Sequence, residues 1–185
     1  QRGLDGWAAY APSDFHNHDA NGLNDAWPGE FSETWLYAPE RTAAGVLQAF
    51  RAGSFFADHG HIVRTVEFSI DAPGLPRPAT AGELIEVPLG TKLTVELKLE
   101  IPNEDWQGRP NRIDAIELIA ITNEGASIRV NQPPDPGRTV LSEVLEVPSG
   151  GIVLRARGRR VVDGGPHLMF YTNPIRARVA EPKQQ

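Results

Sequence analysis

The chain has 185 residues, of which 40% are hydrophobic, and a formal net charge of −6. A chain of this length suits one domain, or one domain with part of another, and buries roughly 70% of its unfolded surface on folding, so a core forms without cross-links. The absence of cysteine excludes disulfide bonds, thiolate metal sites and a cysteine nucleophile. The acidic charge gives little attraction for nucleic acid, and no apolar stretch is long enough to span a bilayer. We therefore expect neither a nucleic-acid partner nor a membrane partner.

Residues 1–38 are rich in Gly, Asn, Asp and Trp and show no sustained periodicity, which predicts an irregular segment. Residues 19–25 resemble half of a calcium-binding loop but lack its register of acids and distal Glu, so they are predicted to form a turn. The large aromatic side chains of this segment are expected to pack it onto the rest of the domain, and they are Trp27, Trp35 and Tyr37.

One helix is predicted immediately after this segment. Thr42 suits the N-cap, Gly53 suits the left-handed C-terminal stop, and Gly45 is expected to weaken the helix slightly. Apolar residues recur between these caps at helical spacing, and they are Ala43, Val46, Leu47 and Phe50.

From about Phe55 onward the hydrophobic pattern has a period of two. The alternation is clearest over residues 62–70 and 92–101, and Pro and Gly clusters separate it from further strand candidates at 113–122, 127–131, 140–147, 151–157 and 168–172. Many short strands of this kind predict a mainly β fold. We expect an antiparallel, immunoglobulin-like β-sandwich from about Phe55 to Val179, with one helix and the irregular N-terminal segment packed against it.

A basic run near the C-terminus, residues 155–160, contains four arginines. Alternation along a strand puts Arg155 and Arg157 on one solvent-facing side. A phosphate-binding patch is one interpretation of this run. Charges that prevent pairing at a sheet edge are the favoured one.

The densest group of metal-ligating side chains is Ser13-Asp14-Phe15-His16-Asn17-His18. A carboxylate and an imidazole two residues apart can point the same way in extended chain and converge on one divalent ion. His18 is a third candidate ligand. The alternative is a solvated loop in which Asp14 caps a turn and His16 is merely exposed.

A second group is Asp58-His59-Gly60-His61. His59 and His61 are weaker candidates for contact with an ion or a substrate. The alternative, and the favoured reading from spacing alone, is a turn between the helix and the next strand with both imidazoles in solvent.

The chain resembles the C-terminal end of a metallohydrolase of the PHP superfamily (polymerase and histidinol phosphatase domain), in the subgroup that carries a C-terminal β-domain. The residues that carry the resemblance are Ser13-Asp14-Phe15-His16, Thr34-Trp35-Leu36-Tyr37-Ala38, Val46 to Gly53 with Phe55-Phe56 and Gly60, Ile116 to Ile119, and Thr172-Asn173-Pro174-Ile175.

The resemblance implies a role for Asp14 and His16, which match the last metal motif of a distorted β/α barrel that holds divalent ions and hydrolyses phosphoesters or related bonds. It implies Zn, Mn or Fe as the ion of the whole hydrolase, with at best weak binding in this chain through Asp14, His16 and His18. It also implies a phosphoester or other small-molecule substrate for the whole hydrolase, and a place for His59 and His61 near the active-site rim. The earlier ligands of the family, which include a His-x-His, have no counterpart in this chain. Residues 1–54 are then the end of the hydrolase domain and residues 55–185 an accessory β-sandwich.

Three further expectations follow from the missing ligands. We expect the chain to be part of a longer protein, to be inactive alone, and to be able to associate with its own N-terminal portion. The competing hypothesis is a non-catalytic β-sandwich module that binds carbohydrate, protein or cell wall and makes no use of its His and Asp residues.

Overall fold

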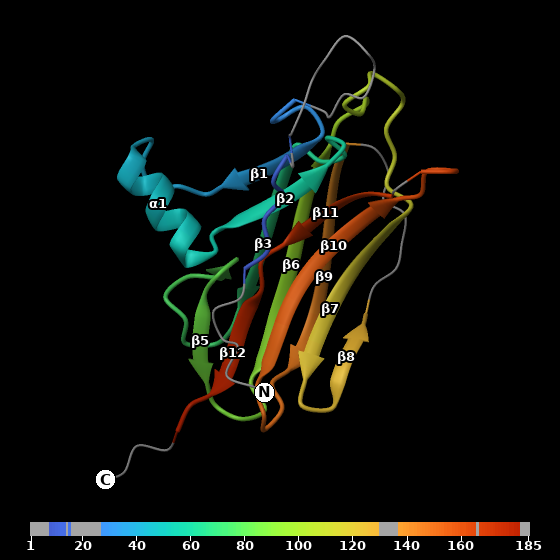
Figure 1. The fold of residues 1–185 in the computed structure, drawn as a ribbon. Coiled ribbons are helices and arrows are strands. Elements are labelled where there is room, and N and C mark those ends of the chain that lie inside the picture. The colour runs from blue at the N-terminus through green and yellow to red at the C-terminus, as the bar shows by residue number, and fades with distance from the viewer. Residues whose placement is uncertain (1–7, 14, 16–26, 130–136, 166, 182–185) are drawn as a thin grey trace.

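The computed structural model describes residues 8–13, 15, 27–129, 137–165 and 167–181. It confirms the predicted mainly β fold, a β-sandwich with one helix in the described residues (Figure 1); the strand pairs are antiparallel except that of β5 and β12, which is parallel. The larger sheet has the order β1 (Ser32–Leu36), β2 (Phe55–His59), β11 (Leu168–Thr172), β10 (Ile152–Arg160), β12 (Ile175–Val179) and β5 (Leu84–Val87), with β7 (Ala115–Thr122) on β10 and β8 (Gly125–Ile128) on β7. The smaller sheet has the order β4 (Ala79–Thr80), β3 (Thr65–Asp71), β6 (Lys92–Ile101) and β9 (Gly137–Glu146).

The core lies between the two sheets and follows the period-two pattern. Along β6 every second residue is buried, from Leu93 to Ile101. Inward residues of β3 and β10, such as Phe68 and Leu154, complete the same cluster. Each such side chain contributes about 1.5–3 kcal/mol when it leaves water, so alternation alone accounts for the pairing of these faces.

Strand β1 differs from the prediction for residues 1–38. It pairs with β2 in the register Ser32↔His59 to Leu36↔Phe55, so residues 32–36 belong to the larger sheet. The strand is only five residues long and follows a Gly-rich stretch, and a pattern this short does not stand out from loop. Trp35 stacks on Phe56 with ring centroids 6.2 Å apart, and the hydroxyl of Tyr37 donates to the backbone oxygen of Val66. These two aromatics attach the segment to the sandwich, as predicted.

Strand β10 also differs from the prediction, because it is not at an edge. It pairs with β7, β11 and β12, so the interpretation of its arginines as edge protection is wrong. Arg155 and Arg157 do share the outer face of the sheet, and Arg157 forms an ion pair with Glu117, which is directly opposite on β7. An ion pair across a central strand offsets charge within the sheet.

The helix α1 (Ala43–Ala52) has the predicted ends. The Thr42 hydroxyl accepts a hydrogen bond from the Gly45 N–H at 3.1 Å, and Gly53 is left-handed with φ of 70°. Gly45 lowers helix propensity, but it allows a close approach of the backbone: a Cβ at this position would lie 2.4 Å from the carbonyl oxygen of Glu40. The residue is glycine because the incoming chain crosses the first turn of the helix.

We predict that Gly45→Ala lowers the free energy of unfolding by about 1–3 kcal/mol, because the added methyl must displace backbone. An unobstructed helical glycine would instead gain about 1 kcal/mol from the same change. Gln48→Ala, at an exposed position of the same helix, is the matched control and should be nearly neutral. Urea unfolding of both variants is the measurement, and a more stable Gly45→Ala protein would contradict the close contact with Glu40.

Candidate functional site

The strongest predicted ligands, Asp14, His16 and His18, lie outside the described residues, as do residues 19–25. The chain that leads to Asp14 is described and is hydrogen-bonded to the sandwich. The Ala9 N–H donates to Asn173 Oδ1 at 2.7 Å, and the Ala11 N–H donates to Thr34 Oγ1 at 3.0 Å. The hydroxyl of Tyr171 donates to the Tyr10 carbonyl at 3.1 Å.

These bonds create a junction, which we define as residues 8–11 together with Thr34, Gly53 and Asn173. A Cβ at Gly53 would lie 3.5 Å from Ala8 Cβ and 3.9 Å from Asn173 Nδ2, so the end of α1 meets the same point. Asn173 is fully buried although its Nδ2 has no partner among the described residues. Segments that are far apart in the sequence therefore converge immediately before the Asp-x-His motif.

His59 is a half-buried side chain on the outer face of β2. Its Nδ1 lies 2.8 Å from Ser32 Oγ, and its ring centroid lies 5.7 Å from that of Phe31 and 6.1 Å from that of Tyr171. Burial lowers the pKa of His59. The ring is therefore neutral at physiological pH, the protonation state that a metal ligand requires.

His61 takes up a left-handed backbone conformation with φ of 52°. Its Nε2 lies 3.2 Å from Glu33 Oε1 and 3.1 Å from the Gly29 carbonyl oxygen. Ser32 and Glu33 are neighbours on β1, so their side chains point to opposite faces of the strand, and the contacts of His59 and His61 diverge. Within the described ranges, no group of three or more His, Asp or Glu side chains could hold a metal ion.

Asp58, next to the predicted ligand His59, is a buried carboxyl that was not among the predicted ligands. It sits between Glu33 and Phe170 in the sheet and has no exposed surface. Neither carboxyl oxygen accepts a hydrogen bond of ordinary geometry from the described residues, although the backbone N–H groups of Val63 and Ile62 are close enough to act on it. Burial raises the pKa of Asp58 to about 8, against the smaller, opposing effect of the backbone N–H groups of Val63 and Ile62. Its carboxyl is therefore mostly neutral at pH 7. Asp58 lies two residues after the apolar Phe56, and this spacing in a strand was the sequence feature that could have indicated an inward-facing carboxyl.

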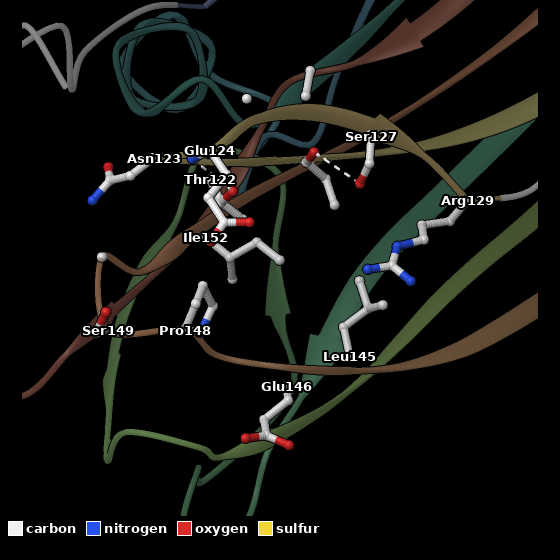
Figure 2. Close-up of a pocket in the computed structure, with 14 residues that line it drawn as sticks. Thr122, Asn123, Glu124, Ser127, Arg129, Leu145, Glu146, Pro148, Ser149 and Ile152 are labelled. Carbon is white, nitrogen blue, oxygen red and sulfur yellow. Dashed lines mark hydrogen bonds between the residues drawn. The ribbon is translucent and has the colours of Figure 1, made fainter.

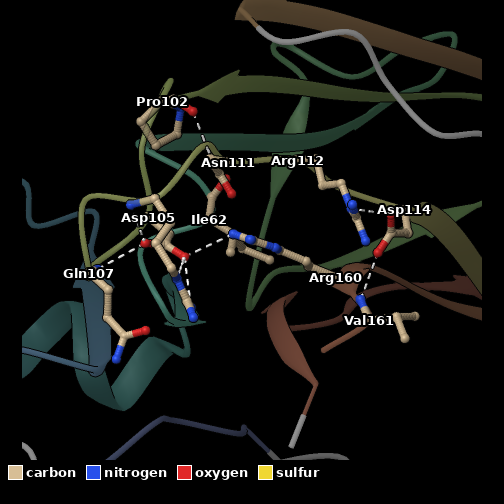
Figure 3. Close-up of polar contacts among 10 residues, drawn as sticks. Ile62, Pro102, Asp105, Gln107, Asn111, Arg112, Asp114, Arg160 and Val161 are labelled. Atoms are coloured by element: carbon tan, nitrogen blue, oxygen red, sulfur yellow. Dashed lines mark hydrogen bonds and ion pairs between the residues drawn. The ribbon is translucent and has the colours of Figure 1, made fainter. Parts of the chain in front are cut away.

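A second polar cluster closes the same end of the sandwich (Figure 3). The buried carboxylate of Asp105 lies 2.9 Å from both Arg109 and Arg160 and accepts the backbone N–H groups of Gln107 and Arg109. Asn111 donates to the carbonyl oxygens of Ile62 and Pro102, both at 3.0 Å. Arg160 thus forms an internal ion pair with Asp105, and Arg157 is paired with Glu117, so two of the four arginines of the alternative phosphate-patch interpretation already have a carboxylate partner.

A groove of about 470 Å³ lies at the other end of β7 and β10, between the β7–β8 turn and the β9–β10 turn (Figure 2). Its polar lining contains both charge signs and several hydroxyl or amide groups, namely Thr122, Asn123, Glu124, Arg129, Glu146 and Ser149. Its lining has no aromatic side chain. The groove could not be predicted from the sequence, because its walls come from two turns that only the pairing of the strands brings together.

Comparison with known proteins adds no assignment to this geometry. No family model matches the chain, and no curated protein matches it. Within the described part of the chain, no helix has the length and apolar character needed to cross a membrane.

We predict that Asp58 makes the fold less stable as pH rises. Its pKa is raised from 3.8 to about 8 in the folded state, so its favourable contribution is complete below pH 3.8, declines above it, and is lost beyond about pH 8. The free energy of unfolding should fall by about 4 kcal/mol between about pH 5 and about pH 9.

Asp58→Asn, which is neutral and of the same shape, should remove most of this pH dependence and stabilise the protein at about pH 9. Asp163→Asn, at an exposed position, is the control and should keep the parent profile. Urea unfolding at several pH values is the measurement. An equal pH slope in Asp58→Asn and the parent protein would show that this carboxyl is not the responsible group.

Proposed function

We propose that this chain is the C-terminal portion of a PHP-like metal-dependent hydrolase, with residues 55–185 as its accessory β-sandwich. Asp14 and His16, with His18, would be ligands of a divalent ion such as Zn, Mn or Fe. The ion and the remainder of the hydrolase domain would together act on a phosphoester or a similar bond. The chain alone would be inactive because it holds only part of the ligand set.

The strongest support for this proposal is an apolar face on the N-terminal side of the sandwich that the described residues leave largely exposed. Helix α1 buries only Gly45 and Ala49, while Val46, Leu47 and Phe50 are 45%, 53% and 45% exposed. The same face includes Tyr10, which is 53% exposed and whose ring centroid lies 5.7 Å from that of Phe50. Figure 1 shows α1 beside β1, at the side of the sandwich.

The occupant that we propose for this face is the rest of the hydrolase domain. A helix in a folded domain normally buries its apolar stripe, and a large exposed apolar patch marks an interaction surface. The resemblance independently assigns α1 to the hydrolase domain and not to the accessory domain. An apolar stripe on this element that the described residues leave about half exposed agrees with that assignment.

The junction supports the placement of the metal motif. Asp14 follows only three residues after Ala11, whose backbone is bonded to Thr34. Ligands that begin at a fixed anchor lose less conformational entropy when they converge on an ion. A divalent ion held there would acidify a bound water and stabilise the negative charge that develops during hydrolysis.

Metal uptake by the purified chain tests the proposal. We expect native mass spectrometry and calorimetry with Zn²⁺ or Mn²⁺ to detect one bound ion. The double variant Asp14→Asn, His16→Gln should bind it at least about 10–100-fold more weakly, since even loss of a residue that only supports a ligand has that effect. His167→Gln, which removes an exposed histidine, is the control.

Two results would contradict the proposal. One is a parent chain that takes up no ion, and the other is a double variant with unchanged affinity. The melting temperature should stay nearly constant across all three proteins, because the buried core cluster described between the sheets is built from residues between Phe56 and Ala177 of the β-sandwich.

The groove favours a second candidate function, a binding module. Its mixed charges and hydroxyls suit a polar ligand such as a carbohydrate or a short peptide. Arg129→Ala should abolish any signal on glycan and peptide arrays, whereas Arg112→Ala, an exposed arginine outside the groove, should not. A signal that survives Arg129→Ala would exclude the groove as the binding site.

A further inference from the structure

The outer face of the larger sheet carries a surplus of positive charge, although the chain as a whole has a net charge of −6. By their registers, the strands of this sheet place five arginines and two glutamates on the outer face, and no other Asp, Glu, Lys or Arg. These residues are Arg155, Arg157, Arg159, Arg176, Arg178, Glu86 and Glu117. A face with such a surplus attracts anions.

Three of these arginines form a row along β10, which lies between β7 and β11 (Figure 1). Arg155, Arg157 and Arg159 occupy every second position and share the outer face. Arg157 pairs with Glu117, and the Nε of Arg159 lies 4.0 Å from the other carboxylate oxygen of Glu117. One carboxylate does not neutralise three guanidinium groups, so the row itself keeps a positive charge.

Arg155 is the arginine of this row that has no carboxylate opposite it. It faces Ile119 on β7, its side chain is partly buried, and its Nε has no hydrogen-bond partner among the described residues. Burial, and then the charge of Arg157, lower the pKa of Arg155, while Tyr171 is close enough to act in the opposite direction. A partly buried cation without a counter-ion costs free energy, and an anion bound beside it would reduce that cost.

We propose that Arg155 and Arg157 together bind one phosphate group on the outer face of β10, beside Tyr171. Residues two positions apart in a strand have Cα atoms about 7 Å apart, so two long side chains on one face can reach the same tetrahedral anion. Arg157 donates its Nε–H to Glu117, and a guanidinium has five N–H donors. The remaining donors of Arg157 can therefore contact the anion while Glu117 holds the side chain in place.

The chemistry of the site favours a small molecule that carries a phosphate group. The planar donor fork of arginine matches two oxygens of a phosphate, which a simple halide lacks. A long polyanion such as nucleic acid would be repelled by the remainder of the chain, with its net charge of −6. The site uses neither the metal motif nor the groove, so it does not depend on either function proposed above.

Calorimetric titration of the whole chain with inorganic phosphate tests the proposal. The titration is done at constant ionic strength with a chelator present, so that no divalent ion contributes. We expect one phosphate to bind per chain, and Arg155→Gln to weaken the binding by about tenfold or more, because it removes charged donors. Arg64→Gln is the matched control, since it removes the same charge from an exposed arginine next to the smaller sheet, and should leave the affinity nearly unchanged.

Three results would overturn the proposal. They are the absence of saturable binding, equal affinity in the parent chain and Arg155→Gln, and acetate binding as tightly as phosphate, which would indicate a site for any anion. Because Arg155 faces Ile119, Arg155→Gln breaks no ion pair across the strands, and urea unfolding should show that its stability is retained.

Nuclear magnetic resonance of the parent chain provides a second test that needs no variant. Phosphate should shift the backbone amide signals of β10 around Arg155 and Arg157, with the same midpoint as the calorimetric titration. The signals of β6, in the smaller sheet, should stay in place. Shifts confined to elements other than β10 and its neighbours β7 and β11 would locate the anion elsewhere and reject this site.

Discussion

Strand β2 is the element on which the arrangement of the N-terminal half depends. It pairs with β1 on one side and β11 on the other, so it joins residues 32–36 to a strand more than 130 positions later in the sequence. Helix α1 ends directly before it, and the stacking of Phe50 on Phe55, with centroids 5.3 Å apart, holds the helix to the outer face. Its inner face carries Asp58, the one carboxyl that the core encloses without a partner among the described residues. A single strand thus connects the metal-motif segment, the helix and the core.

The face formed by α1 and Tyr10 is apolar, which suits permanent burial inside a larger domain.

The buried polar groups divide into those that hold the fold and those that strain it. Asp105 is surrounded by two arginines and two backbone N–H groups, and such a satisfied carboxylate specifies one conformation of its loop. Asp58 is not surrounded in this way, so the free-energy cost of burying its carboxyl depends on whether that carboxyl is protonated. The same end of the sandwich therefore contains a rigid clamp and a pH-sensitive position within a few residues of His59.

Local patterns in the sequence were sufficient for the helix and for most strands. Thr42 and Gly53 act through their immediate neighbours, and the alternation of β6 expresses one buried face, so neither depends on distant contacts. The position of a strand within its sheet could not be predicted in this way, because the alternating pattern of β10 is compatible with both a central strand and an edge strand. The role of Gly45 depends on the approach of Glu40, and the state of Asp58 on the depth of the core around it. Only the tertiary structure decided these, since each depends on what long-range strand pairing brings next to the residue.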